Sequence, residues 1–146
     1  MFENLLRRLL TPAPDRLDAT DAPLALAALL VRVARADGHY TEAERARIDR
    51  VLARLYALSP FAAADLQGRA AVLEAEAPDT VRFTRALKET VPLDDRAGLI
   101  EALWSVALSD GSRGEEEDQV IRLVASLLGL TDRDSALARQ RSATQG

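Results

Sequence analysis

The fold is decided by residues 33–44, VARADGHYTEAE, a stretch that recurs in altered form at residues 106–117 as VALSDGSRGEEE. In both copies an apolar segment runs into Asp-Gly, a short gap follows, and the next segment opens on acidic residues. Matching residues at one constant offset are Asp37/Asp110, Gly38/Gly111, Glu42/Glu115, Glu44/Glu117, Ile48/Ile121 and Val51/Val124. A fixed offset is typical of an internal repeat. We therefore predict a duplicated helix–corner–helix unit, with a first corner at 37–44 and a second corner at 110–117.

The composition favours one domain with a substantial core. The chain has 146 residues, and single domains typically hold about 100–150, so we expect residues 1–146 to form one domain. Hydrophobic residues make up 48% of the chain but aromatic residues only 4%, which predicts a core of close contacts between small aliphatic side chains. The formal net charge of −4 argues against a nucleic-acid partner and would attract cations.

Missing residue types exclude several kinds of site. The chain has no cysteine and one histidine, which excludes disulfides, thiolate metal sites, cysteine nucleophiles and a His-rich zinc site. No apolar run reaches the roughly 20 residues that a transmembrane helix needs. The apolar stretch in Met1–Leu10 contains Arg7 and Arg8, whereas a secretory signal carries its positive charge before the apolar region. We expect a cytoplasmic protein with no transmembrane segment.

The spacing of apolar residues predicts an all-α fold. Apolar stripes recur at helical spacing, and no stretch shows the sustained alternation of a strand. We expect a compact bundle of seven to eight helices with its core at about 24–130, an N-terminal helix at Met1–Leu10 and a frayed tail at Arg139–Gly146. The segment Leu24–Ala36 is apolar almost all round, and Leu99–Ser109 is its apolar partner, so the two should pack together and form the buried centre. Side chains expected inside the bundle are Leu30, Val33, Leu103 and Val106 from these segments and Ile48, Val51, Leu52 and Leu55 from the helix after the first corner.

Capping signals predict where the helices begin and end. Thr41 followed three residues later by Glu44 matches a capping box. Ser59-Pro60 combines an N-cap with a first-turn proline. Gly38 and Gly111 are expected where the backbone needs a positive φ angle or where a side chain will not fit. Further caps are expected at Asp79, Gly129 and Thr131.

Each acidic corner can be read in two ways. Carboxylates brought together at a helix junction are hard oxygen ligands for Ca²⁺ or Mg²⁺, and the candidate ligands are Asp37, Glu44, Asp110, Glu115 and Glu117. The alternative is structural, because acidic residues in a first helical turn interact well with the helix dipole and Asp-Gly is ordinary turn chemistry. Neither corner is an EF-hand, since Ile48 and Ile121 occupy the position of the bidentate Glu. Spacing alone favours the capping interpretation.

No pattern in the sequence indicates a catalytic site. His39 has no visible partner or pocket and is expected to be an exposed turn residue. Ser105 and Ser109 have no nucleophile motif around them, and no glycine-rich phosphate loop is present. Trp104 is expected to be a core residue and not one that stacks against a ligand. We therefore expect a protein that is not an enzyme.

The residues of the two corners resemble the TerB family, the tellurite-resistance-associated and DjlA-amino-terminal-like helical domain. The resemblance rests on Ala36-Asp37-Gly38 with Glu44 and on Ser109-Asp110-Gly111 with Glu117. It implies a bacterial cytoplasmic all-helical domain with a role in stress or tellurite response. It also implies divalent-metal binding at the acidic positions and partners at the inner membrane face.

Three functional hypotheses come from the sequence, and an enzyme that uses paired carboxylates for acid/base work is the least favoured of them, because no nucleophile, cofactor motif or base–orienter pair appears. The first is a non-enzymatic module that binds a divalent cation, Ca²⁺ or Mg²⁺, at the acidic corners. The second is a protein-interaction module without metal, in which the corners are helix caps and an exposed face docks an unknown protein partner.

Overall fold

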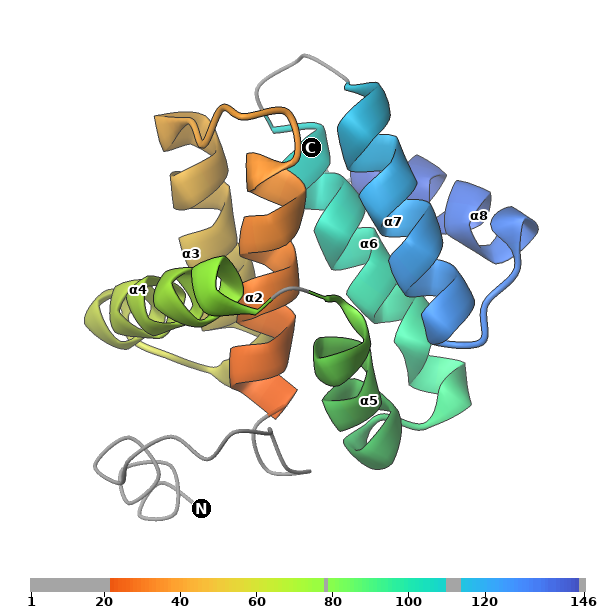
Figure 1. The fold of residues 1–146 in the computed structure, drawn as a ribbon, viewed down its shortest axis with the longest axis horizontal. Coiled ribbons are helices and arrows are strands. Elements are labelled where there is room, and N and C mark those ends of the chain that lie inside the picture. The colour runs from red at the N-terminus through yellow and green to blue at the C-terminus, as the bar shows by residue number, and fades with distance from the viewer. Residues whose placement is uncertain (1–21, 78, 110–113, 145–146) are drawn as a thin grey trace.

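The computed structural model describes residues 22–77, 79–109 and 114–144, and this part of the chain is all-α (Figure 1). Its helices are α2 (Ala22–Arg35), α3 (Glu42–Tyr56), α4 (Pro60–Glu76), α5 (Val81–Thr90), the 3₁₀ helix η2 (Leu93–Asp95), α6 (Arg96–Ala107), α7 (Glu115–Leu127) and α8 (Asp132–Thr144). Within these ranges there are seven α-helices and no strand, which confirms the predicted all-α class. The helix predicted at Met1–Leu10 lies outside the described residues. None of the helices described is long and apolar enough to cross a membrane.

Helices α2 and α6 lie side by side in the middle of the bundle. Figure 1 shows α3 and α4 on one side of this pair and α7 and α8 on the other, with α5 beneath. Every residue from Ala25 to Val31 is fully buried because α2 contacts α3, α4, α5, α6 and α7. Leu30, Val33, Leu103 and Val106 are also fully buried, so the predicted centre is confirmed. The two helix–corner–helix units have the expected order, but their origin by duplication remains a prediction.

The helix ends follow the local signals. Thr41 caps α3 in a complete capping box with Glu44, and Ser59 caps α4, whose first residue is Pro60. Gly129 closes α7 at a φ of 81°. Thr131 and Asp134 exchange hydrogen bonds at the start of α8, where the Thr131 amide donates to Asp134 at 2.9 Å and the Asp134 amide donates to Thr131 at 3.1 Å. The Thr131 amide and hydroxyl together lower the pKa of Asp134.

Three local predictions need correction. Leu55 is 48% exposed, because it lines an open pocket between α3, α6 and α8 and not the closed core. The N-cap of α5 is Thr80, which already has helical dihedrals, although Asp79 still accepts a hydrogen bond from the Arg82 amide at 3.3 Å. The tail predicted to fray from Arg139 instead continues α8 to Thr144.

The last turns of α8 have packing partners that the sequence did not reveal. Ala138 is fully buried, and the Arg139 guanidinium lies 5.5 Å from the centre of the Trp104 ring. The Trp104 indole in turn donates to the Ser135 hydroxyl at 3.2 Å, so this tryptophan is the core residue that was predicted. These contacts join α8 to α6.

Candidate functional site: the acidic corners

The first corner is a tight turn closed by its own side chains. Gly38 adopts a φ of 82°, as predicted, and its amide donates to the Arg35 carbonyl at 2.9 Å. A carboxylate oxygen of Asp37 accepts a hydrogen bond from the His39 amide at 2.9 Å. The His39 side chain is 80% exposed, whereas that of Asp37 is 24% exposed. Asp37 therefore holds the turn through one oxygen, and His39 is the solvent-facing residue expected from the sequence.

Glu44 is fully buried in the first turn of α3. One of its carboxylate oxygens, Oε1, accepts from the Thr41 amide at 2.9 Å and from the Thr41 hydroxyl at 3.1 Å. The Thr41 hydroxyl oxygen accepts from the Glu44 amide at 3.1 Å. Burial of a carboxylate is costly without such donors. The capping interpretation is therefore correct for this oxygen of Glu44.

The second corner opens α7 without a side-chain cap. Its N-cap is Gly114, which makes no side-chain capping bond, and four acidic residues fill the first turn: Glu115, Glu116, Glu117 and Asp118. Glu117 is 1% exposed, whereas Glu115 and Glu116 are exposed. Asp110 and Gly111 lie outside the described residues. The acidic first turn suits the positive end of the α7 dipole.

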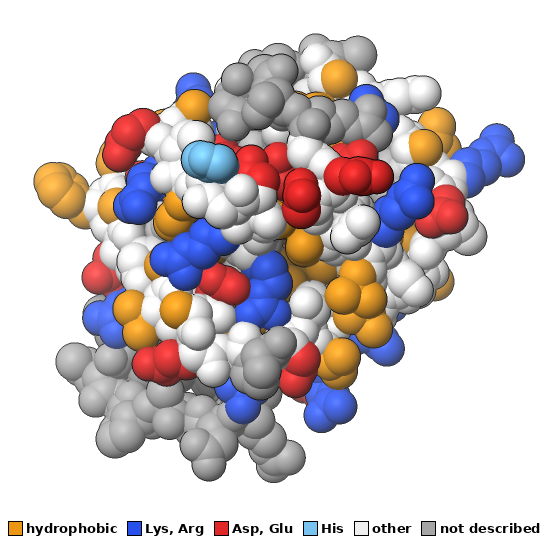
Figure 2. Space-filling model, turned by 45° about the horizontal axis from the view of Figure 1, so that its top comes forward, with side chains coloured by type: hydrophobic (Ala, Val, Ile, Leu, Met, Phe, Trp, Pro, Cys, Tyr) orange, Lys and Arg blue, Asp and Glu red, His pale blue; other side chains and the backbone are white. Residues whose placement is uncertain are grey.

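The two corners meet around Gly114. A methyl group placed on Gly114 would lie 3.0 Å from Oε1 of Glu117, 3.4 Å from Oε2 of Glu116 and 3.8 Å from the Asp37 Cβ. The structure therefore brings together two of the predicted ligands, Asp37 and Glu117, and adds Glu116, which sequence reasoning missed. Figure 2 shows acidic side chains gathered beside His39 on this face. One carboxylate oxygen of Glu44 is committed to the cap of α3, and Glu115 is exposed.

No group of three His, Asp or Glu side chains within the described ranges has the arrangement of a preformed metal site. The proximity of Asp37, Glu116 and Glu117 is thus a concentration of negative charge and not a finished coordination sphere. The signal for Glu116 was available in the sequence as part of a run of four acids. Sequence spacing could not distinguish Glu116 from the neighbouring acids, because only the packing of α7 against the first corner places it beside Asp37.

A groove continues from this acidic site along the surface. It encloses about 430 Å³ and is lined by residues of α2, α4 and α7, together with Ala36: Arg32, Arg35, Ala36, Glu74, Glu116, Gln119, Val120 and Leu123. Figure 2 shows the face hollowed between arginine side chains and apolar ones. Glu116 belongs to both the groove and the acidic site. The apolar part of the groove includes Leu123, which is 49% exposed.

The arginines of the groove are held by Glu74. Arg32 donates through Nε to Glu74 at 3.0 Å, and Arg35 donates to the other Glu74 oxygen at 2.9 Å. Arg32 also donates to the backbone carbonyl of Ala77 at 2.6 Å and lies 5.3 Å from the Phe83 ring centre. These contacts join α2 to α4 and α5. We assign this cluster a structural role.

Tyr40 fixes the chain between the first turn and α3. Its hydroxyl donates to Gln67 of α4, and the Arg45 guanidinium lies 4.1 Å from the centre of its ring. Burial raises the pKa of Tyr40, and the nearby charges of Arg45 and Arg35 act in the opposite direction. The Gln67 amide donates in turn to the Arg45 carbonyl at 3.1 Å. The first corner is therefore positioned from both α2 and α4.

Comparison with known proteins gives one match. A family model described as "Tellurite resistance protein TerB" matches residues 23–140, which is most of the chain. No curated protein matches, and no solved structure matches.

Proposed function

The chain belongs to the tellurite resistance protein TerB family, and from this premise we propose that it is a non-enzymatic module that binds a divalent cation between its two corners. The observation that carries the proposal is the convergence of Asp37, Glu116 and Glu117 around Gly114. These side chains come from two segments more than seventy residues apart. A cation held between them would offset the repulsion of like charges.

The expected ligand is Ca²⁺ or Mg²⁺, because carboxylate oxygens are the ligands that both ions prefer. The positive end of the α7 dipole opposes a cation on the helix axis, so the ion would sit to one side, toward Asp37. With few protein ligands and water completing the shell, the dissociation constant should be on the order of 10⁻⁴–10⁻³ M. Binding would link the end of α2 to the start of α7.

Thermal unfolding at fixed ionic strength tests this proposal. A ligand that binds the folded state at ten times its dissociation constant stabilises it by about 1.4 kcal/mol. For a domain of this size the melting temperature should rise by about 3–6 °C. Either Ca²⁺ or Mg²⁺ at millimolar concentration should produce this rise.

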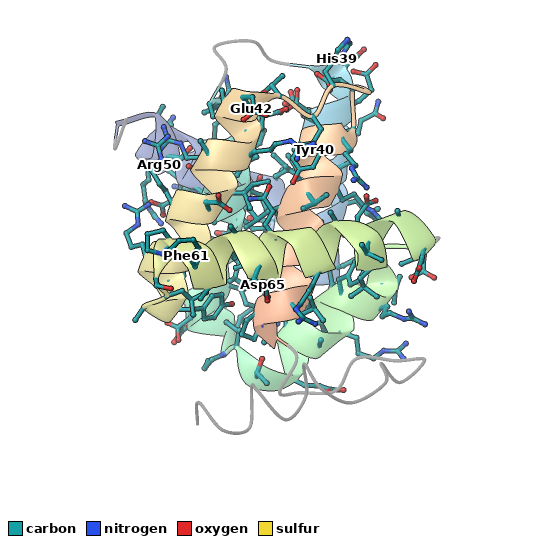
Figure 3. All side chains as sticks on the ribbon, turned by 90° about the vertical axis from the view of Figure 1, so that its left-hand side faces the viewer. His39, Tyr40, Glu42, Arg50, Phe61 and Asp65 are labelled. Atoms are coloured by element: carbon teal, nitrogen blue, oxygen red, sulfur yellow. The ribbon has the colours of Figure 1, made fainter. Side chains whose placement is uncertain are left out.

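Amide substitutions locate the site. Asp37→Asn and Glu117→Gln should each remove most of the rise, and Asp110→Asn with Glu117→Gln should abolish it. Asp65→Asn is the matched control, because it removes the same charge from an exposed position on α4 away from the corner (Figure 3). If Asp65→Asn lost the rise in melting temperature to the same extent, the rise would come from general screening of negative charge and not from binding at the corners. If neither ion changes the melting curve, the metal-binding proposal is wrong and the acidic residues of the corners serve only as helix caps.

The groove beside the corner favours a second candidate function, a protein-interaction module. Its exposed Leu123 and partly buried Val120 offer apolar surface, and Glu116 at its edge offers a negative charge. We propose a cytoplasmic protein partner that docks here, with the corners as structural caps. If neither cation changes the melting curve, this function takes first place, and Leu123→Asp should then abolish partner binding without lowering the melting temperature.

A further inference from the structure

A pocket between α3, α6 and α8 carries positive charge that no acidic side chain in the described ranges neutralises by direct contact. It encloses about 240 Å³, and Arg47 and Arg54 of α3, Glu101 and Ser105 of α6 and Ser142 of α8 line it. None of its lining residues belongs to the corners or to the groove described above.

Arg47 and Arg54 face the pocket together because they are seven residues apart, two turns of one helix. No carboxylate of the described residues lies within 4.0 Å of either guanidinium. The Nε atom of Arg47 is buried and has no hydrogen-bond acceptor there. Arg32 and Arg35, by contrast, share Glu74. A guanidinium that is partly withdrawn from water favours an anionic ligand.

On the α6 side of the pocket, Ser105 offers a hydrogen-bond donor and Glu101 an acceptor. The Ser105 hydroxyl makes no hydrogen bond to the described residues and can donate to an anion. The Ser142 hydroxyl already donates to the Arg139 carbonyl at 2.8 Å. Glu101 is an acceptor only, since an ionised carboxylate has no proton to donate. An anion that contacts Glu101 as well as the arginines therefore needs a proton that it can donate to this carboxylate.

We propose that this pocket binds inorganic phosphate in its hydrogen phosphate form. Arg47, Arg54 and Ser105 donate to the phosphate oxygens, and the single P–OH group donates to Glu101. The volume is below the roughly 300–1,000 Å³ of pockets that hold drug-sized ligands, so the ligand is a small ion. Sulfate has the same shape but no proton and would place a bare oxygen against the Glu101 carboxylate.

Three anions of equal charge test the proposal by calorimetry at about pH 8 and fixed ionic strength. Hydrogen phosphate keeps its proton, sulfate has none, and the phosphate group of glycerol phosphate, whose second pKa is about 6, has lost its own. Wild-type protein should bind hydrogen phosphate at least about tenfold more tightly than either of the others, which is the effect of one charge-assisted hydrogen bond. Equal binding of the three anions, or none of phosphate, would overturn the proposal.

Variants assign the roles of the residues. Arg47→Gln and Arg54→Gln should each weaken phosphate binding about tenfold or more, and the exposed position of Arg54 keeps that variant folded. Arg50→Gln is the matched control, because Arg50 is exposed on the same helix and does not line the pocket (Figure 3). Glu101→Gln should bind sulfate and phosphate alike, since a Gln amide can donate to either. Equal loss in Arg50→Gln, or preserved discrimination in Glu101→Gln, would contradict the assignment.

Discussion

The first corner is closed by its own side chains, whereas the second is completed by packing. In the first, Asp37 holds the turn and Thr41 caps α3 together with Glu44. In the second, the N-cap is Gly114, which has no side chain to offer, and Asp37 of the first corner approaches it. Both corners have a buried Glu at the same place, Glu44 and Glu117. Equal spacing of carboxylates therefore does not give them equal roles.

The largest expected effect concerns the helices that precede the corners. Leu30 of α2 and Leu103 of α6 are both fully buried, so Leu30→Ala and Leu103→Ala should each lower the free energy of unfolding by about 2–5 kcal/mol. Urea unfolding measures this. Similar losses would show that the two units contribute equally to one core. If the free energy of unfolding falls by less than about 0.5 kcal/mol at either site, the two helices are not equivalent, because losses of that size are typical of surface substitutions.

The N-caps should differ in sensitivity. Thr41→Ala removes a cap hydrogen bond and one donor to the buried Glu44 carboxylate, so it should cost about 1–2 kcal/mol. Gly114→Ala should cost less, about 0.5–1 kcal/mol, because the carboxylate oxygen of Glu117 that its methyl group meets at 3.0 Å ends a flexible side chain. Chemical denaturation of both variants tests the order. A larger loss in Gly114→Ala would make the second corner the more rigid one.

Gly38 tests the turn of the first corner. Its φ of 82° disfavours any L-residue, although no heavy atom lies within 4 Å of an added Cβ. Strain in the left-handed region costs about 1–2 kcal/mol, and a stiffer unfolded chain offsets about 0.4–1 kcal/mol of this cost. Gly38→Ala should therefore destabilise the protein by about 0.5–1 kcal/mol in urea. A neutral or stabilising result would mean that the turn can adopt an ordinary conformation.

The smallest effect is expected where the helices after the corners end. Gly129 follows the end of α7 at a φ of 81°, whereas Ala57 follows the end of α3 at a φ of 53° in the same left-handed region. Ala57→Gly removes that strain at some cost in chain entropy, so it should stabilise the protein by about 0.5 kcal/mol. The variant should melt at a slightly higher temperature. An unchanged or lower melting temperature would show that the end of α3 is not strained.

Local sequence patterns were enough to predict the helices of the described residues, most of their caps and the buried centre. Apolar spacing, the Thr41–Glu44 capping box and Gly129 act over one or two turns, so they can be read without knowing the fold. The same local signals misplaced the last turns of α8, because Arg139 is ordered by Trp104, a residue of another helix. Leu55 was misassigned for a similar reason, since helical spacing does not show where a core ends.

Which charged side chains lie close together depends on helix packing, and no local pattern reveals it. Packing of α7 against the first corner selects Asp37, Glu116 and Glu117 from nine acidic candidates in and beside the two corners, Asp37, Glu42, Glu44, Asp49, Asp110, Glu115, Glu116, Glu117 and Asp118. Packing of α3 against α6 likewise places Arg47 and Arg54 opposite Glu101. The physical reason is that the proximity of these side chains depends on the angles between helices that are distant in sequence. Those angles are set by the shape of the whole core and not by any local pattern.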